Sequence, residues 1–104
     1  MPNTIESITV HSFEQHGAAR HPGALMHVEE LEFYAALDGW YLGVVCRDRH
    51  DNDYSFAVLG PDPVGAKRWI GGADSIKSID EARTKLHEEL GQFAAKGKRV
   101  HQQD

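Results

Sequence analysis

The chain has 104 residues, of which 40% are hydrophobic and 26% charged, the composition of one ordinary folded domain spanning 1–104. Its net charge is -5, and an acidic chain is repelled by phosphate backbones, so we expect no nucleic-acid binding. No run of about 18 apolar residues occurs and no basic residue precedes Arg20, so we expect no membrane span, no signal peptide and a cytoplasmic location.

The first 27 residues are expected to form an N-terminal arm of uncertain structure. Ile5, Ile8 and Phe13 have a spacing that suits a short helix, whereas residues 4–10 would also pass as a strand. A helix or an irregular arm is favoured, with a turn at His21-Pro22-Gly23.

A hairpin is the clearest element of the sequence. Asp38-Gly39 separates two apolar runs at about 30–37 and 40–47, and this dipeptide favours a two-residue type I′ turn. The alternative is a helix over residues 24–37. The turn also fixes a register that separates an apolar face from a mixed one. On the apolar face the pairs are Phe33/Val44, Ala35/Leu42 and Leu31/Cys46, and on the mixed face they are Tyr34/Gly43, Ala36/Tyr41, Glu32/Val45 and Glu30/Arg47.

Two further strands are expected after the hairpin. A strand at about 53–60 alternates cleanly, and Tyr54, Phe56 and Val58 would join the face of Val44 if an odd number of residues forms the connecting loop. A shorter strand at about 66–71 would end at Gly71-Gly72.

The C-terminal helix is expected at about 79–96. Ser78 and Glu81 form a capping box, and apolar residues recur at helical spacing along one side. This stripe consists of Ile79, Ala82, Leu86, Leu90 and Phe93. Gly97 would end the helix and leave 97–104 as a flexible tail that contains the basic residues Lys98 and Arg99.

These elements predict an α+β fold, an antiparallel meander of three to four strands packed on one face by the C-terminal helix. The mixed hairpin face would then point away from that helix and would need a cover. Residues 1–27, a second copy of the chain or another protein could each supply it. This outer face would include Tyr34, Ala36, Tyr41, Gly43, Val45, Ala57 and Leu59.

Seven histidines raise the possibility of a metal site. His16, His21 and His27 with Glu30 are the candidate ligands, but steps of five residues aim the rings in different directions on a helix or a strand. Surface or turn histidines are therefore favoured, and we expect no cofactor. A metal-binding domain or a metal-dependent enzyme is the alternative, and a pH-sensing role for the histidines is a third possibility.

The polar stretch between the second and third strands is expected to be a hairpin loop. Asp48 and Asp51 do not have the spacing of a calcium-binding loop. Cys46 falls on the apolar face and cannot form an intramolecular disulfide, so it is expected to behave as an inert core residue.

The sequence thus favours a non-enzymatic protein–protein interaction or regulatory module over an enzyme. Its partner would be another protein or a second copy of the chain, since an acidic surface attracts basic partners. The expected partner-binding residues are Tyr34, Tyr41 and Leu59 on the outer face, and Arg49, His50 and Asp51 in the loop.

Overall fold

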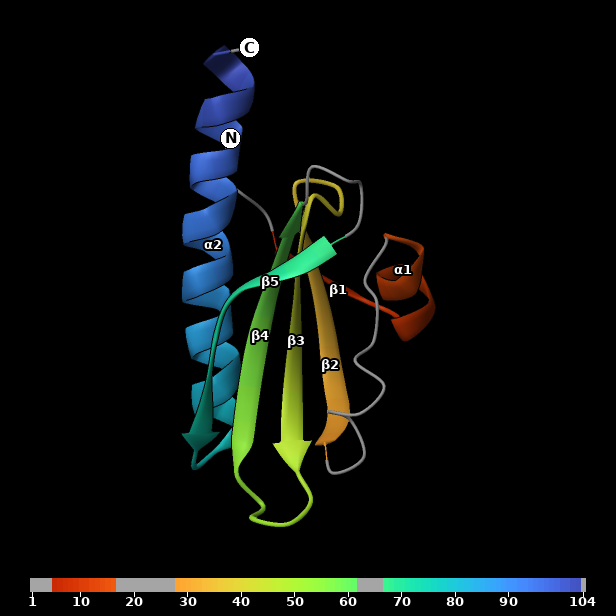
Figure 1. The fold of residues 1–104 in the computed structure, drawn as a ribbon, viewed down its shortest axis with the longest axis vertical. Coiled ribbons are helices and arrows are strands. Elements are labelled where there is room, and N and C mark those ends of the chain that lie inside the picture. The colour runs from red at the N-terminus through yellow and green to blue at the C-terminus, as the bar shows by residue number, and fades with distance from the viewer. Residues whose placement is uncertain (1–4, 17–27, 62–66, 104) are drawn as a thin grey trace.

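The fold is a five-stranded antiparallel sheet with a long C-terminal helix on one face (Figure 1). The computed structural model describes residues 5–16, 28–61 and 67–103. The strands are neighbours in chain order, β1 to β5. The elements are β1 (Ile5–Ile8), α1 (Val10–Gln15), β2 (Val28–Ala36), β3 (Tyr41–Asp48), β4 (Tyr54–Pro61), β5 (Lys67–Ile76) and α2 (Ile79–Gln103). The predicted antiparallel α+β class is confirmed, but the sheet has five strands where three to four were predicted.

The additional strand is β1, in the segment for which a helix or an irregular arm was favoured. Ile5 lies opposite Ala36 and Ile8 opposite Phe33, so the two isoleucines point to opposite faces of the sheet. The helix follows immediately, because the Thr9 hydroxyl accepts a hydrogen bond from the amide of Ser12 (3.1 Å) and caps α1. The segment therefore contains both a strand and a short helix.

The Asp38-Gly39 hairpin is confirmed. Asp38 and Gly39 have φ angles of 55° and 89°, as a type I′ turn requires, and the amide of Trp40 donates to the carbonyl of Leu37 (3.1 Å). The predicted pairs hold from the turn outward to Glu32. Beyond that point a β-bulge shifts the register by one residue, so the outermost two predicted pairs are wrong. Glu30 lies opposite Cys46 and Glu29 opposite Arg47.

The helix packs on the other face from the one predicted. Phe56 and Val58 do not share a face with Val44, because Phe56 lies opposite Val45 and Val58 opposite Gly43. Helix α2 packs on the mixed hairpin face together with these β4 side chains. The prediction that this face points away from the helix is therefore wrong.

The loop between β3 and β4 explains the difference. The amide of Asp48 donates to the carbonyl of Asp53 (2.8 Å), which leaves four residues, 49–52, in the loop. An even number shifts the pairing by one residue relative to the odd number assumed, and a one-residue shift exchanges the faces of a strand.

Each face of the sheet carries its own hydrophobic cluster. The cluster under α2 contains the expected stripe of helix residues and is completed by strand residues. Its buried members are Tyr34, Ala36, Val45, Phe56, Val58, Ile76, Ala82, Leu86, Leu90 and Ala94. The cluster on the opposite face, which we call the open face, comprises Phe13, Ala35, Leu42, Val44, Cys46, Ala57 and Leu59.

Both C-terminal elements are longer than predicted. Gly71-Gly72 does not end β5, which continues to Ile76 and bends strongly along its length (Figure 1). The capping bond from the amide of Glu81 to the Ser78 hydroxyl is present (3.1 Å), but α2 runs through Gly97 to Gln103. One glycine costs a helix only about 1 kcal/mol and does not by itself end it. Within the described ranges, no helix combines the length and apolar character needed to cross a bilayer.

Candidate binding site

Helix α1 covers part of the open face. Phe13 is buried, and its ring centroid lies 4.9 Å from that of Phe33 on β2. The N-terminal segment therefore covers one portion of the apolar surface, and a hollow lies on the portion nearer to β5.

A hollow of about 760 Å³ lies on the open face across β2, β3, β4 and β5. Its floor is apolar and includes Val44 and Ala57, each only 4% exposed. One side is formed by β5 from Trp69 to Ser75, and another by the β3–β4 loop. A volume of this size can accommodate a drug-sized molecule or a few residues of an extended chain.

The hollow is acidic. Among the described residues that line it there is no lysine or arginine, and five carry carboxylates. These residues are Glu30, Asp48, Asp51, Asp53 and Asp74. Asp53 forms an ion pair with Lys77, with 3.0 Å between Oδ1 and Nζ. The hollow therefore has a negative potential that favours a positively charged ligand.

Two aromatic side chains border the same hollow. Trp69 is 56% exposed, the largest exposed fraction among the large hydrophobic side chains described, and Tyr54 is half-buried. Trp69 faces this side because it lies opposite Leu59, which belongs to the open-face cluster. An exposed tryptophan beside an apolar floor is typical of interface hot spots.

Two β-bulges and a glycine shape the β5 wall. The register between β4 and β5 shifts twice, between Tyr54 and Phe56 and between Val58 and Leu59. Gly72 has a φ of 146°, and a Cβ there would lie 2.4 Å from the carbonyl oxygen of Phe56. Bulges bend and coil a strand, so the glycine and the irregular register together account for the bend of β5 over the open face.

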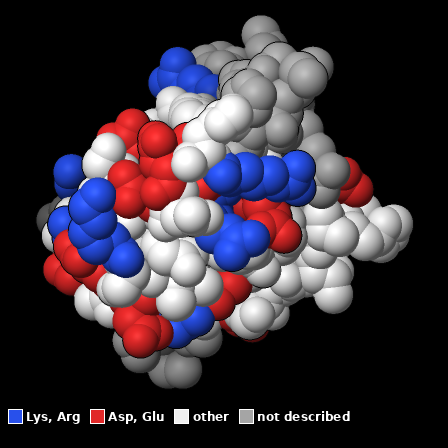
Figure 2. All heavy atoms as spheres, turned by 90° about the horizontal axis from the view of Figure 1, so that it is seen from below, with Lys and Arg blue, Asp and Glu red and all other residues white. Residues whose placement is uncertain are grey.

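Asp48 organises the loop on the other side of the hollow. Its Oδ1 accepts hydrogen bonds from the amides of His50 (2.8 Å) and Asp51 (3.3 Å), an Asx-type arrangement. Asn52 adopts a φ of 58° and donates its amide to the carbonyl of Asp48 (2.8 Å). Viewed from the end of the molecule where this loop lies, acidic and basic side chains alternate (Figure 2). The loop has a defined geometry that presents Asp51 to the hollow.

Cys46 also lines the hollow, and its protonation state limits the chemistry there. Burial, with the nearby Glu30 carboxylate, raises the pKa of the Cys46 thiol to about 12, although a hydrogen bond with Ser55 opposes the shift. The thiol is therefore protonated at neutral pH, whereas a nucleophilic cysteine needs a lowered pKa.

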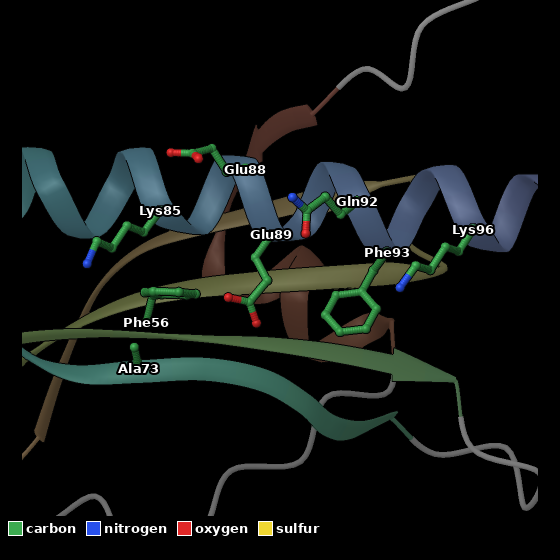
Figure 3. A pocket seen from close by; sticks show the side chains of 8 residues that line it. All are labelled: Phe56, Ala73, Lys85, Glu88, Glu89, Gln92, Phe93 and Lys96. Carbon is green, nitrogen blue, oxygen red and sulfur yellow. The ribbon is translucent and has the colours of Figure 1, made fainter.

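A second, smaller hollow of about 470 Å³ lies between α2 and β5 (Figure 3). Glu89 reaches from the helix toward the sheet between the rings of Phe56 and Phe93, and its carboxylate occupies the space that a Cβ on Gly71 would need. Lys96 lies 6.0 Å from the Phe93 ring centroid. The described residues lining this groove carry charges of both signs, so it has no net preference for an anion or a cation. They are Phe56, Ala73, Lys85, Glu88, Glu89, Gln92, Phe93 and Lys96.

A polar clamp joins α2 to β2 away from both hollows. Arg83 binds both carboxylate oxygens of Glu32, with Nε 2.9 Å from Oε1, and Tyr34 donates its hydroxyl to the same Oε1. The His87 ring meets the Tyr34 ring edge-on, with 4.8 Å between centroids. The Arg83 hydrogen bond is the main reason that the pKa of Glu32 is lowered from its ordinary value of 4.5; burial opposes this and the Tyr34 hydroxyl assists it.

The lowered pKa of Glu32 predicts a specific pH dependence. The folded state holds Glu32 ionised more strongly than the unfolded state does, so its contribution is fully present above pH 4.5 and is lost as pH falls through the lower folded-state value. We expect Glu32→Gln to be less stable than the wild type at pH 7, and the difference to shrink steadily below pH 4.5. Urea unfolding of both proteins between pH 3 and pH 7 would measure this. A difference that is constant with pH would contradict it.

The predicted outer-face residues lie in three different environments. Tyr34 is 7% exposed and lies under α2. Tyr41 is half-buried on the same side, stacked 6.3 Å from the Phe93 ring. Leu59 is on the open face but is 3% exposed and does not line the hollow. The structure does not bring these three side chains together into one exposed surface.

The predicted loop residues lie closer to the candidate site. Asp51 lines the hollow, and Arg49 and His50 are exposed beside it in the same loop. Their predicted role in partner binding stays a prediction.

The candidate metal ligands are only partly described. His16 packs against the β2–β3 turn, where its ring occupies the space that a Cβ on Gly39 would need, and Glu30 lines the hollow. His21 and His27 lie outside the described residues. Among residues 5–16, 28–61 and 67–96, no three His, Cys, Asp or Glu side chains are grouped closely enough to hold a metal ion.

Sequence reasoning missed Trp69 and Asp74, which border the hollow. The alternation of Arg68, Trp69 and Ile70 is a sequence signal that places Trp69 on the face opposite to its neighbours. No pattern in the sequence indicates the bend of β5 that carries Trp69 over the open face.

Comparisons with protein-family models, with curated proteins and with solved structures find no match to this chain.

Proposed function

We propose that this chain is a non-enzymatic protein-interaction module that binds an extended segment of another protein in the open-face hollow. The single observation that carries the proposal is the combination, in one hollow, of an apolar floor with Trp69, a residue that is 56% exposed. Tryptophan is among the residues that contribute most to binding energy at protein interfaces.

The shape of the hollow supports a protein segment over a small molecule. The hollow spans four strands, and its lining residues Asp51, Gly72 and Asp74 are exposed. Sites for small molecules usually enclose most of the ligand surface, whereas an open surface that crosses several strands suits a chain lying along it.

The charge of the hollow supports a different protein over a second copy of this chain. A two-fold dimer interface brings the same patch of both subunits together. Five carboxylates of one copy would then face five of the other, and like charges brought together across an interface are unfavourable. The partner is therefore a protein of different sequence.

Selection from a library of random displayed peptides tests this proposal without assuming a sequence for the partner. We expect the wild-type chain to enrich peptides that bind the Trp69→Ala variant at least about tenfold more weakly, the effect of losing one hot-spot side chain. Trp40→Ala is the matched control, because Trp40 is 40% exposed at the β2–β3 turn and does not line the hollow. Peptides that bind both variants as tightly as the wild type, or a library that gives no enrichment, would refute the proposal.

A further inference from the structure

We infer that the partner segment presents lysine or arginine side chains to the hollow, where the Trp69 ring and the carboxylates of Asp51 and Asp74 receive them. This inference rests on the proposed function and specifies the chemistry of the partner.

The sign of the charge is the first support. The described lining contains five carboxylates and no lysine or arginine, and one of the five, Asp53, is paired with Lys77. Asp51 and Asp74 are both exposed residues of the lining, one in the β3–β4 loop and one on β5. Neither carboxylate forms an ion pair with a lysine or arginine of the described residues. A cation that enters the hollow is therefore attracted by both carboxylates.

The second support is the match between the hollow and the two parts of a basic side chain. Lysine and arginine have an apolar stem and a charged head. Val44 and Ala57 offer the stem an apolar floor, and the exposed Trp69 side chain can bind an ammonium or guanidinium group by a cation–π interaction. A neutral polar side chain can donate a hydrogen bond to a carboxylate, but it gains neither charge–charge attraction nor a cation–π interaction.

The groove between α2 and β5 provides an internal contrast. It is also bordered by aromatic rings, but Lys85 and Lys96 lie in it beside Glu88 and Glu89 (Figure 3). Its mixed charge would not select a basic segment. The selectivity is therefore assigned to the open-face hollow alone.

Titration of Trp69 fluorescence with defined peptides tests the inference. The chain has two tryptophans, so Trp40→Phe leaves Trp69 as the only one. Three capped peptides of equal length, alternating Gly-Lys, Gly-Gln and Gly-Glu, serve as probes. We expect the Gly-Lys peptide to bind at least about tenfold more tightly than the Gly-Gln peptide, the Gly-Glu peptide not to bind, and the Gly-Lys affinity to fall as salt rises.

Two double variants in the Trp40→Phe protein show where the charge acts. Asp51→Asn with Asp74→Asn is expected to weaken Gly-Lys binding at least about fivefold at low salt. Glu6→Gln with Glu88→Gln changes the net charge equally through exposed carboxylates outside the hollow, and is expected to change the affinity less than about twofold. Circular dichroism of both double variants would check that they are folded.

The outcomes separate the inference from the proposed function. If the Gly-Lys peptide does not bind, binds no more tightly than Gly-Gln, or is weakened equally by both double variants, the inference is overturned. The proposed function would still stand if the library selection yields neutral peptides that require Trp69. It fails only if that selection yields no Trp69-dependent peptide.

Discussion

Leu86→Ala is expected to lower the free energy of unfolding by about 2–5 kcal/mol, the usual range for truncating a buried leucine. Leu86 is fully buried at the centre of the contact between α2 and the sheet. Directly beneath it is Gly43, where an added Cβ would lie 2.6 Å from Cδ1 of Leu86. Gly43→Ala is therefore expected to cost about 1–3 kcal/mol through overpacking.

The double variant makes this a test of which face the helix covers. In Gly43→Ala with Leu86→Ala, the new methyl group enters the space that the leucine vacates, so the loss should be smaller than the sum of the two single losses. Equilibrium unfolding in urea measures all three variants. Additive losses would mean that the two residues do not touch, and that α2 does not lie on the face that carries Gly43.

Gly72→Ala is expected to be the second strongly destabilising change. With φ at 146°, this position lies outside the region that other residues readily adopt. The added Cβ would also meet two backbone atoms of β4, the carbonyl oxygen of Phe56 at 2.4 Å and Cα of Ala57 at 3.1 Å. Strain of about 1–3 kcal/mol adds to overpacking of about 1–3 kcal/mol.

The same substitution at Gly91 is the matched control. Gly91 lies within α2, and a Cβ there would meet nothing within 4 Å. Gly91→Ala is therefore expected to raise the free energy of unfolding by roughly 0.5–1 kcal/mol, because alanine favours the helix. If thermal unfolding shows equal effects for the two glycines, the backbone of β5 does not have the geometry described.

Local signals predicted the elements that depend on few residues. The Asp38-Gly39 turn determined the first five pairs of the hairpin, and the Ser78 cap with its apolar stripe placed the start and the buried side of α2. Each of these features depends on residues that are close in sequence, so turn and capping chemistry suffice.

Which face of the sheet α2 covers could not be predicted, because it depends on the exact loop length and on the positions of β-bulges. Whether the β3–β4 loop has four or five residues decides which β4 side chains lie under α2, and the bulge at Glu30 shifts the outer register. Both sides of the hairpin are apolar enough to be covered, as the two clusters show. Hydrophobicity alone could therefore not select the helix-bearing face.

The candidate site could be predicted even less well than the faces, because its residues are brought together only by the tertiary structure. Asp51 was singled out through its place in a polar loop, but Trp69 and Asp74 join it only because β5 bends over the open face. The residues that form the hollow come from four strands and one loop. No local pattern connects them.

Mapping amide chemical shifts by NMR while adding the Gly-Lys peptide to the wild-type chain is the most direct test of the account. We expect shifts at the floor and β5 wall of the open-face hollow, at the amides of Cys46, Ala57 and Gly72 and at the indole N–H of Trp69. Shifts confined to the α2–β5 groove around Gln92 would contradict the assignment of partner binding to the open face, and no shifts at all would contradict the inference that the partner segment is basic.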